Sequence, residues 1–478
     1  MAVSYGSPRI LNTAISGLWF GVEDTQGTSM SEFTADGWSA STPVNNTPTT
    51  VSILSSSGAR DNDNISAIAV DRFVGLQVVF EADTATSGLQ KKAYNISAST
   101  VPNGDGVVTL TVDNMDATPA NSGTSDTFKV VARLPATEFV PNLETDILER
   151  DFMRDTLIGP SAIAGNSFAS GSFEMEAHGL VTALGDAVTP VADRYSLFLE
   201  TFYGTRNAAT GTNVTSGNTT TITVASVAGL DENDVVVINN EARIITDITG
   251  SVITISPPLS ASPSPSDIVY GTESFTPFDT AHTSGTLYVK HDDRLTKILG
   301  CLGSIKLSAE VSGKAMYTFD FKGEWDNTQT AIGAGEELAG YQLSKRPVAC
   351  RSFRASHFGT TSMILNKFEY DHTAEPLEIK DGEAGYRFFI RSSEAGCAVT
   401  TRYQNTNAKT WQTAGTLGRL LVVTGNSAGD WVGCHGLAFV SSTVGETEIN
   451  KNVYNEIPFK FYDDQDSNDD KKPRLIRG

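Results

Sequence analysis

Residues Arg294 to Trp325 read RLTKILGCLGSIKLSAEVSGKAMYTFDFKGEW, and a similar pattern occurs again from Trp431 to Tyr462, WVGCHGLAFVSSTVGETEINKNVYNEIPFKFY. Each stretch has a GCxG tetrad, a strand pattern, a turn containing glycine, and a second strand in which apolar and polar residues alternate. Alternation with a period of two places all the rings on one face of a strand. The two stretches therefore predict one hairpin that is used twice. The expected core motif consists of Gly300, Cys301, Gly303, Tyr317, Phe319 and Phe321 in the first copy and Gly433, Cys434, Gly436, Tyr454, Phe459 and Phe461 in the second.

The composition of the 478-residue chain favours an all-β protein with more than one domain. Short apolar runs are separated by turn residues, and amphipathic helical patterns are scarce. The formal net charge of -21 predicts that the whole molecule repels nucleic acids and anionic membranes. We expect no tight binding to either.

The cysteines and the N-terminus indicate the compartment. Cys301, Cys350, Cys397 and Cys434 are dispersed and include no CxxC, so we expect free buried thiols and no disulfide framework. The first residues lack a basic region followed by an apolar core, and nowhere do 18 apolar residues run together. We therefore expect a protein made in the cytosol without a membrane span.

Two segments, residues 42–134 and 210–271, are predicted as small β modules inserted into loops of a larger domain. They resemble each other. GLQVVFEAD from Gly75 parallels ENDVVVINN from Glu232, and the stretch from Val107 parallels the one from Ser251, including an Ala/Pro/Ser turn before a closing strand.

The remaining residues divide into two tandem domains. SGSFEMEAHG followed by RYSLFLETF is echoed by SMILNKFEYDH followed by GYRFFIRSS, so we expect the duplication to span whole domains. The prediction is an all-β chain of two tandem β-sandwich or barrel domains, with the modules in loops. Its parts are a first domain of residues 1–41, 135–209 and 272–332, a linker 333–346, a second domain 347–462, and a flexible charged tail 463–478.

Three segments allow more than one secondary structure. ADRYSLFLETFYG, from Ala192, fits a helix or a buried strand, and AIGAGEELAGYQLS, from Ala331, fits a short helix or a linker. The stretch from Asn142 fits a helix or an extended charged arm flanked by prolines, and we favour the arm. Its candidate residues are Leu143, Glu144, Asp146, Glu149, Arg150, Asp151 and Arg154.

Three motifs suggest chemistry, but each has a simpler explanation. Gly425 to Gly429 matches the GxSxG pattern around Ser427, yet a strand pattern follows where a nucleophile elbow needs a helix, so a hairpin turn is expected. The HDD triplet from His291 fits a turn better than a metal site, because adjacent strand residues point to opposite faces. The acidic run from Asp463 lacks the glycine and terminal glutamate of an EF-hand loop. We expect no catalytic residues, no cofactor and no metal.

The order of these patterns resembles the major tail tube protein of long-tailed, siphovirus-like bacteriophages. The resemblance lies in the proline-flanked arm from Val140 to Pro160, in SGSFEMEAHG and RYSLFLETFYG, and in GTLYVKHDDRLTKILGCLGSIKLSAEVSGKAMYTFDFKGEW. Small β modules inserted in such proteins resemble Asn233 to Tyr270.

The resemblance implies a structural virion protein of the phage tail, assembled in the host cytoplasm from stacked homo-oligomeric rings around a lumen through which DNA passes. A chain with two such domains would form a ring from three copies, and the arm would order on stacking. The implied partners are further copies of the chain and the tape measure, terminator and baseplate proteins of the tail. The alternative is a receptor- or carbohydrate-binding surface or fibre protein, in which aromatic-bearing β modules are common.

Overall fold

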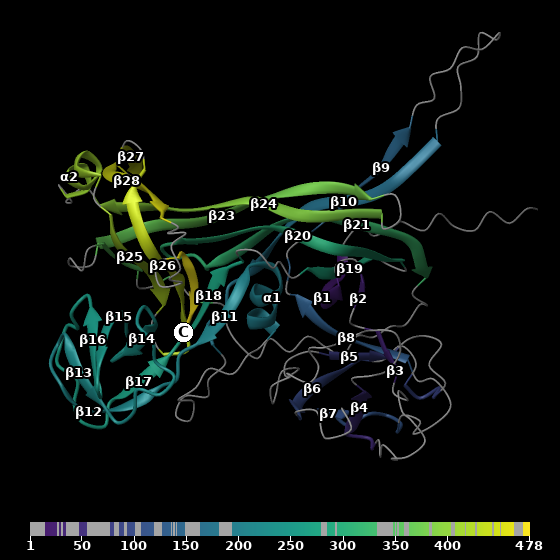
Figure 1. The fold of residues 1–478 in the computed structure, drawn as a ribbon, viewed down its shortest axis with the longest axis horizontal. Helices are drawn as coiled ribbons and strands as arrows, with labels where there is room; N and C mark the ends of the chain where they lie inside the picture. Colours follow the sequence, from purple (N-terminus) through teal and green to yellow (C-terminus); the bar gives the residue numbers. More distant parts are fainter. Residues whose placement is uncertain are drawn as a thin grey trace, which may run out of the picture.

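The structure is a computed structural model that describes residues 15–25, 28–29, 32–34, 47–54, 77–80, 86–89, 93–100, 107–118, 127–134, 136, 139, 141–148, 163–180, 194–278, 284–291, 294–331, 348, 350, 353–357, 363–381, 385–402, 407–415, 417–425, 428–441, 444–449, 451–462 and 472–478. Within this part of the chain, 23 strands are connected through hydrogen-bonded pairings, and six others close into a separate barrel (Figure 1). The predicted all-β class is confirmed.

The first repeat is built on six antiparallel strands in the order β1–β19–β20–β21–β10–β9. The MYTFDF alternation of β21 buries Tyr317, Phe319 and Phe321 on one face, as the period of two requires. Its elements are β1 (Ile15–Thr25), β9 (Asn142–Leu148), β10 (Ile163–Glu176), α1 (Arg194–Phe202), β19 (Gly285–His291), β20 (Arg294–Glu310) and β21 (Met316–Ala331).

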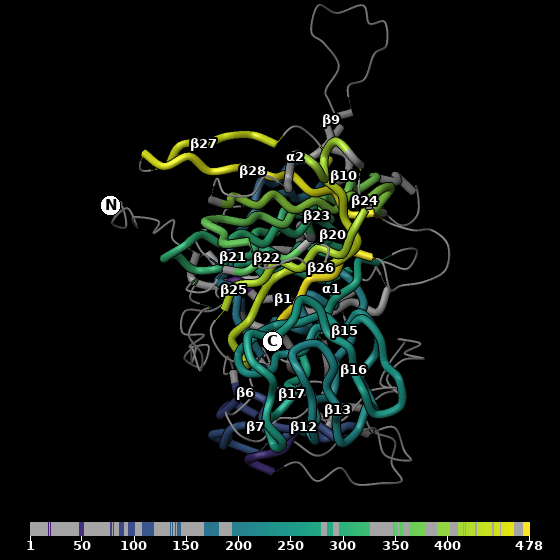
Figure 2. Tube along the Cα trace, turned by 90° about the vertical axis from the view of Figure 1, so that its left-hand side faces the viewer, coloured from purple at the N-terminus to yellow at the C-terminus, as the bar shows by residue number. Residues whose placement is uncertain are grey.

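The second repeat has the same order of pairings, β22–β25–β26–β28–β24–β23, and β22 also pairs with β23, which closes the circuit. Figure 2 shows β27 and β28 projecting from one end of the molecule. The elements are β22 (Phe353–His357), β23 (Met363–Asp381), β24 (Gly385–Arg402), α2 (Asn407–Ala414), β25 (Gly418–Gly425), β26 (Trp431–Val440), β27 (Gly445–Ile449) and β28 (Asn452–Phe461).

The structure corrects one of the correspondences expected between the repeats. RYSLFLETF forms helix α1, whereas GYRFFIRSS lies in strand β24, so the two segments are not equivalent. By order and pairing, β24 corresponds to β10 and α2 to α1. The helix forms because Phe198 and Phe202, four residues apart, both pack against Phe319, with ring centroids 5.5 and 4.8 Å away.

Residues 212–271 form a closed six-stranded barrel with a core of its own. This segment lies within the predicted module 210–271. The barrel is inserted between two paired strands, β11 (Gly204–Ala208) and β18 (Glu273–Pro277). Its strands are β12 (Thr212–Gly217), β13 (Thr221–Val224), β14 (Val235–Ile238), β15 (Glu241–Thr249), β16 (Val252–Ser256) and β17 (Ile268–Gly271).

The N-terminal module repeats most of the barrel's pairings. Its pairings β4–β7, β6–β7, β5–β6, β5–β8 and β3–β8 match β13–β16, β15–β16, β14–β15, β14–β17 and β12–β17 of the barrel. The short β2 (Thr28–Ser29) pairs with β1 beside it. The module strands are β3 (Glu32–Thr34), β4 (Thr50–Leu54), β5 (Gln77–Phe80), β6 (Ala93–Ser99), β7 (Val107–Val112) and β8 (Thr127–Leu134).

The C-terminal residues do not form the expected flexible tail. Residues 463–471 lie outside the described part, but β29 (Arg474–Arg477) is buried along its whole length. The prediction was wrong here because the RLIR segment pairs on both sides, with β18 and with β26. Leu475 lies opposite Phe275 in β18 and Cys434 in β26, so β29 is an interior strand.

Candidate assembly interface

A strand pairing joins the two repeats edge to edge. Residues 305–310 of β20 in the first repeat pair antiparallel with residues 367–372 of β23 in the second. Lys306 Nζ lies 3.7 Å from a carboxylate oxygen of Asp371 across this joint. The main-chain bonds of such a joint do not depend on side-chain identity, so a strand edge of similar shape can form the same contact with another chain.

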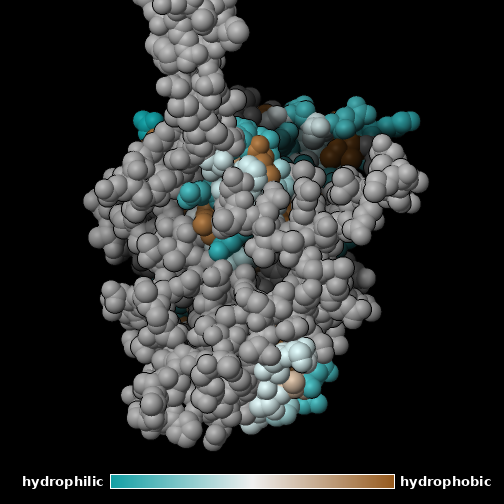
Figure 3. Space-filling model, turned by 90° about the vertical axis from the view of Figure 1, so that its right-hand side faces the viewer, coloured by the Kyte–Doolittle hydropathy of each residue, from teal (hydrophilic) through white to brown (hydrophobic). Residues whose placement is uncertain are grey.

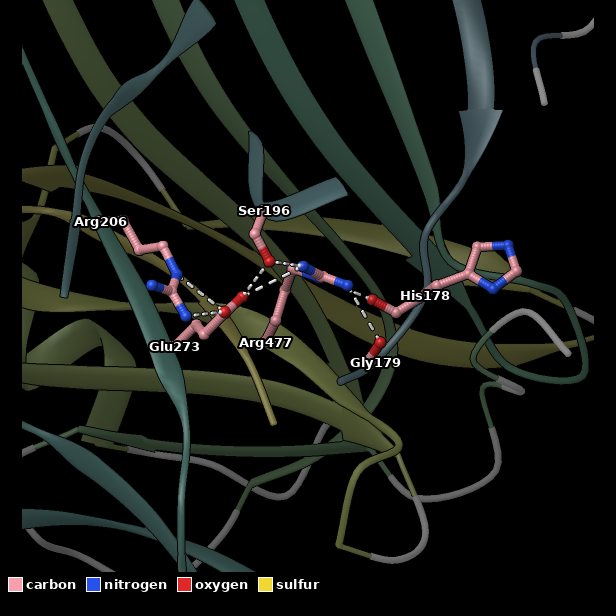
Figure 4. A network of polar contacts seen from close by, with 6 residues as sticks. All are labelled: His178, Gly179, Ser196, Arg206, Glu273 and Arg477. Carbon is pink, nitrogen blue, oxygen red and sulfur yellow. Dashed lines mark hydrogen bonds and ion pairs between the residues drawn. The ribbon is translucent and has the colours of Figure 1, made fainter. Parts of the chain in front are cut away.

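The C-terminal strand makes a second connection between the repeats, and a buried polar network holds it (Figure 4). Arg477 Nη1 donates to Glu273 Oε2 at 3.1 Å and to Ser196 Oγ at 2.8 Å. Arg477 Nε donates to the carbonyl of His178 at 2.9 Å, and Nη2 to that of Gly179 at 3.1 Å. One guanidinium therefore binds the C-terminal strand to β18, to helix α1 and to the chain after β10.

Burial makes this network costly to break. The side chains of Arg477 and Glu273 are both 0% exposed, and Arg206 Nε donates to the second carboxylate oxygen of Glu273 at 2.8 Å. Removing one member of a buried ion pair leaves a charge that water cannot solvate. Sequence reasoning missed these residues, because Glu273 and Arg477 lie 204 positions apart. The only local signal was the apolar pair Leu475 and Ile476 between two arginines.

Two strands present an open edge within the described part of the chain. There β9 pairs only with β10, and β27 pairs only with β28. The two strands lie at opposite ends of the long sheet (Figure 1). The face that carries β9 has a mostly hydrophilic coloured surface with small hydrophobic areas (Figure 3).

The first copy of the sequence motif lies where β20 and β21 pair. Cys301 is fully buried, and Gly300 has φ 60°, a left-handed conformation that favours glycine, at a bulge in β20. Gly303 passes so close to β21 that a Cβ would overlap the carbonyl oxygen of Asp320. The glycines of the tetrad therefore serve backbone geometry and close packing.

The second copy keeps the tetrad but not the whole aromatic row. Cys434 is buried with its sulfur 3.8 Å from that of Cys397, and a Cβ on Gly433 would overlap the carbonyl of Val422. The ring of Phe461 would likewise meet a Cβ on Gly436.

Tyr454 lies outside the buried row. It is only half-buried, whereas Ile457, Phe459 and Phe461 are buried. Five positions separate Tyr454 from Phe459, compared with four between the equivalent Tyr317 and Phe321, and an odd spacing moves a strand residue to the opposite face.

The candidate arm is partly a strand. Leu143, Glu144 and Asp146 lie in β9, which pairs with β10 and is not helical. The end of β9 projects beyond the body of the sheet (Figure 1). The other arm candidates, Glu149, Arg150, Asp151 and Arg154, lie outside the described residues.

The strands that flank two of the remaining candidate motifs pair with each other. Strands β25 and β26, on either side of the GxSxG segment, are antiparallel, so a strand follows where a nucleophile elbow requires a helix. His291, the first residue of the HDD triplet, ends β19 opposite Arg294, the first residue of β20. Ser427, Asp292, Asp293 and the acidic run after Asp463 lie outside the described residues.

Four buried side chains of the core have pKa values shifted towards their neutral forms. The hydroxyls of Tyr203 and Tyr370 are 2.6 Å apart, and burial raises the pKa of both side chains. Burial, together with the neighbouring Cys397, raises the pKa of Cys434 well above its usual value. Burial, then the charges of Arg474 and Arg419, lowers the pKa of His435 well below 6.5. All four cysteines are free and buried, as predicted.

Two comparisons with known proteins found no match. No protein-family model matches the sequence, and no curated protein matches it. Neither helix in the described part of the chain combines the length and the apolar character needed to cross a bilayer. The same residues contain no cluster of His, Cys, Asp and Glu side chains able to hold a metal ion.

Proposed function

We propose that this chain is a structural protein that assembles with copies of itself into rings, and that the rings stack into the hollow tube of a phage tail through which DNA passes. The observation that carries the proposal is the joint between β20 and β23. Two repeats with the same order of pairings are already connected edge to edge within one chain. That connection is one step of a ring made from such repeats.

A head-to-tail contact between identical units generates either a closed ring or an open helical filament. Each chain supplies two repeats and presents strands β9 and β27 at opposite ends of its sheet (Figure 1). Three chains would supply the six repeats of the ring that the sequence resemblance implies. In this arrangement, exposed strand edges are used for assembly and do not remain as sites of unwanted pairing.

Exposed apolar side chains at one rim of the sheet fit the stacking of rings. Ile364 is 74% exposed, and Val311 and Val453 are 43% and 44% exposed. The Val311 amide donates to the carbonyl of Asn366, two residues after Ile364. The Thr401 hydroxyl donates to the carbonyl of Ile364. Thr401 lies opposite Asn455, two residues after Val453. The three apolar residues therefore share one rim, and burial of such a group against the next ring is favourable.

The net charge suits a conduit for DNA. With a formal charge of -21 per chain, phosphate contacts that would slow passage are disfavoured. Individual carboxylates matter little, because two like charges about 10 Å apart in water repel by only about 0.4 kcal/mol before salt screening. Their repetition on every ring is what keeps the nucleic acid mobile.

Negative-stain electron microscopy of the purified full-length chain tests the proposal. We expect rings or long hollow filaments at concentrations where the protein assembles. Compact particles that bind glycans on an array would instead support the receptor- or carbohydrate-binding alternative. A strictly monomeric protein under all salt and concentration conditions would refute the tube.

A further inference from the structure

The first open edge, β9, has a counterpart in the second repeat that is already paired. The comparison uses one row of residues in each repeat, in which each residue lies opposite the next one in the neighbouring strand. The row in the first repeat is Asn142, Ser170 and Lys322, and the row in the second is Asp371, Gly396 and Lys460. The sequence repeat aligns Lys322 with Lys460. Asn142 in β9 therefore corresponds to Asp371 in β23, within the stretch of β23 that pairs with β20.

The chain before β9 follows the same correspondence. In the second repeat, β23 begins beside β22, with Ile364 opposite Arg354. In the first repeat, Leu134 lies opposite Leu18 in β1, the counterpart of β22, shortly before the chain reaches β9. Leu134 and β9 thus lie along the first repeat where the beginning and the later part of β23 lie along the second.

The second open edge, β27, has its counterpart in β20. Asn455 lies five residues before Lys460, as Tyr317 lies five residues before Lys322, and Glu446 lies opposite Asn455 in the same way that Leu307 lies opposite Tyr317. Strand β27 therefore occupies the place of residues 305–310, the part of β20 that pairs with β23. The two open edges are the counterparts of the two strands that form the internal joint.

We propose that β27 of one copy pairs antiparallel with the beginning of β9 in the next copy, in the register of the β20–β23 joint, with Gly445 opposite Asn142. This inference rests on the proposed function and names the contact that closes its rings. The occupant of each edge is a second copy of this chain, because the chain itself shows the mated form of the same two strands.

Charge distinguishes this joint from the internal one. Strand β9 (NLETDIL) and strand β27 (GETEI) each carry two carboxylates and no lysine or arginine. In the internal joint, Lys306 faces Asp371 across the pair, and Gly445 stands in the place of Lys306. The joint between copies therefore brings two acidic edges together, so salt should promote assembly and dilute copies at low salt should stay apart.

Disulfide trapping in the full chain tests the pairing. Asn142 is exposed and a Cβ on Gly445 has room, so an N142C/G445C variant should fold, and residues directly opposite in antiparallel strands lie close enough for a disulfide. The internal control is K306C/D371C, which should form an intramolecular disulfide. Each single variant and the register-shifted pair N142C/E448C serve as negative controls. The native cysteines are buried.

We expect oxidation of the assembled N142C/G445C variant to give a covalent ladder of chains on a non-reducing gel, absent from the controls. Rings or tubes seen by electron microscopy without a ladder would overturn the β27–β9 joint while leaving the proposed function standing. Absence of any assembly, at any salt concentration, would overturn both.

A charge variant tests the same joint without cross-linking. Glu446→Lys reverses one charge on the acidic edge of β27, so this variant should assemble at a protein concentration severalfold lower than the wild type in low salt. Glu375→Lys, at an exposed carboxylate on β23 outside residues 367–372, is the control. Equal shifts in the two variants would contradict the proposal.

Discussion

The replacement Arg477→Met tests whether the C-terminal strand holds the two repeats together. Arg477 is fully buried and donates to Glu273, to Ser196 and to two main-chain carbonyls. Breaking a buried ion pair from one side costs about 3–5 kcal/mol. Arg206 still neutralises part of the charge on Glu273, so we expect the lower end, about 3 kcal/mol, which is roughly a 150-fold change in the unfolding equilibrium constant.

Urea denaturation followed by tryptophan fluorescence measures this loss. Trp431 is buried beside the C-terminal strand, and its amide donates to the carbonyl of Gly478 at 2.5 Å, so its environment reports on β29. The matched control is Lys314→Met, which removes an ion pair with Glu176 made by a lysine that is 58% exposed. Such surface pairs contribute at most about 1 kcal/mol. If Arg477→Met lowers stability no more than Lys314→Met does, the network does not secure the strand.

Three further predictions concern packing, pH and stacking. In thermal denaturation, Gly303→Ala should destabilise the fold by about 2 kcal/mol or more, because a Cβ there overlaps the backbone of β21. Gly445→Ala, whose Cβ has room, should have little effect. The pKa of His435 in the folded protein lies well below 6.5, so as the pH falls the unfolded chain binds the proton first. The contribution of His435 should therefore lower the stability as the pH drops below about 6.5 and leave it constant above that pH. In urea titrations at several pH values, His435→Gln should flatten this slope. In electron micrographs, Ile364→Asp should leave single rings but prevent long tubes. Leu377→Asp, which changes another exposed residue of β23, should still form tubes. Tubes formed by the Ile364 variant would exclude that rim from stacking.

Local patterns predicted those parts of the fold that short-range geometry decides. The hairpin of β20 and β21 follows from the alternation of Tyr317, Phe319 and Phe321, and the barrel lies within the segment that turn residues delimited. Tyr454 was misplaced because a single additional residue before Phe459 reverses the face of a strand.

Long-range contacts decided the rest. RYSLFLETF is apolar enough for a strand, and it is helical because Phe198 and Phe202 together cover Phe319. The last residues look like a soluble tail, but Arg477 finds its partner Glu273 204 positions away. No periodicity in the sequence encodes such a pairing. The open edges of β9 and β27 likewise became visible only once the strand order of both repeats was known.

A cryo-electron microscopy reconstruction of the assembled protein tests the central claim most directly. We predict a hollow ring in which the sheet continues without a break from β27 of each chain into β9 of its neighbour, as it continues from β20 into β23 within the chain. A particle in which these two edges contact different partners, or in which the repeats of one chain are separated, would contradict it.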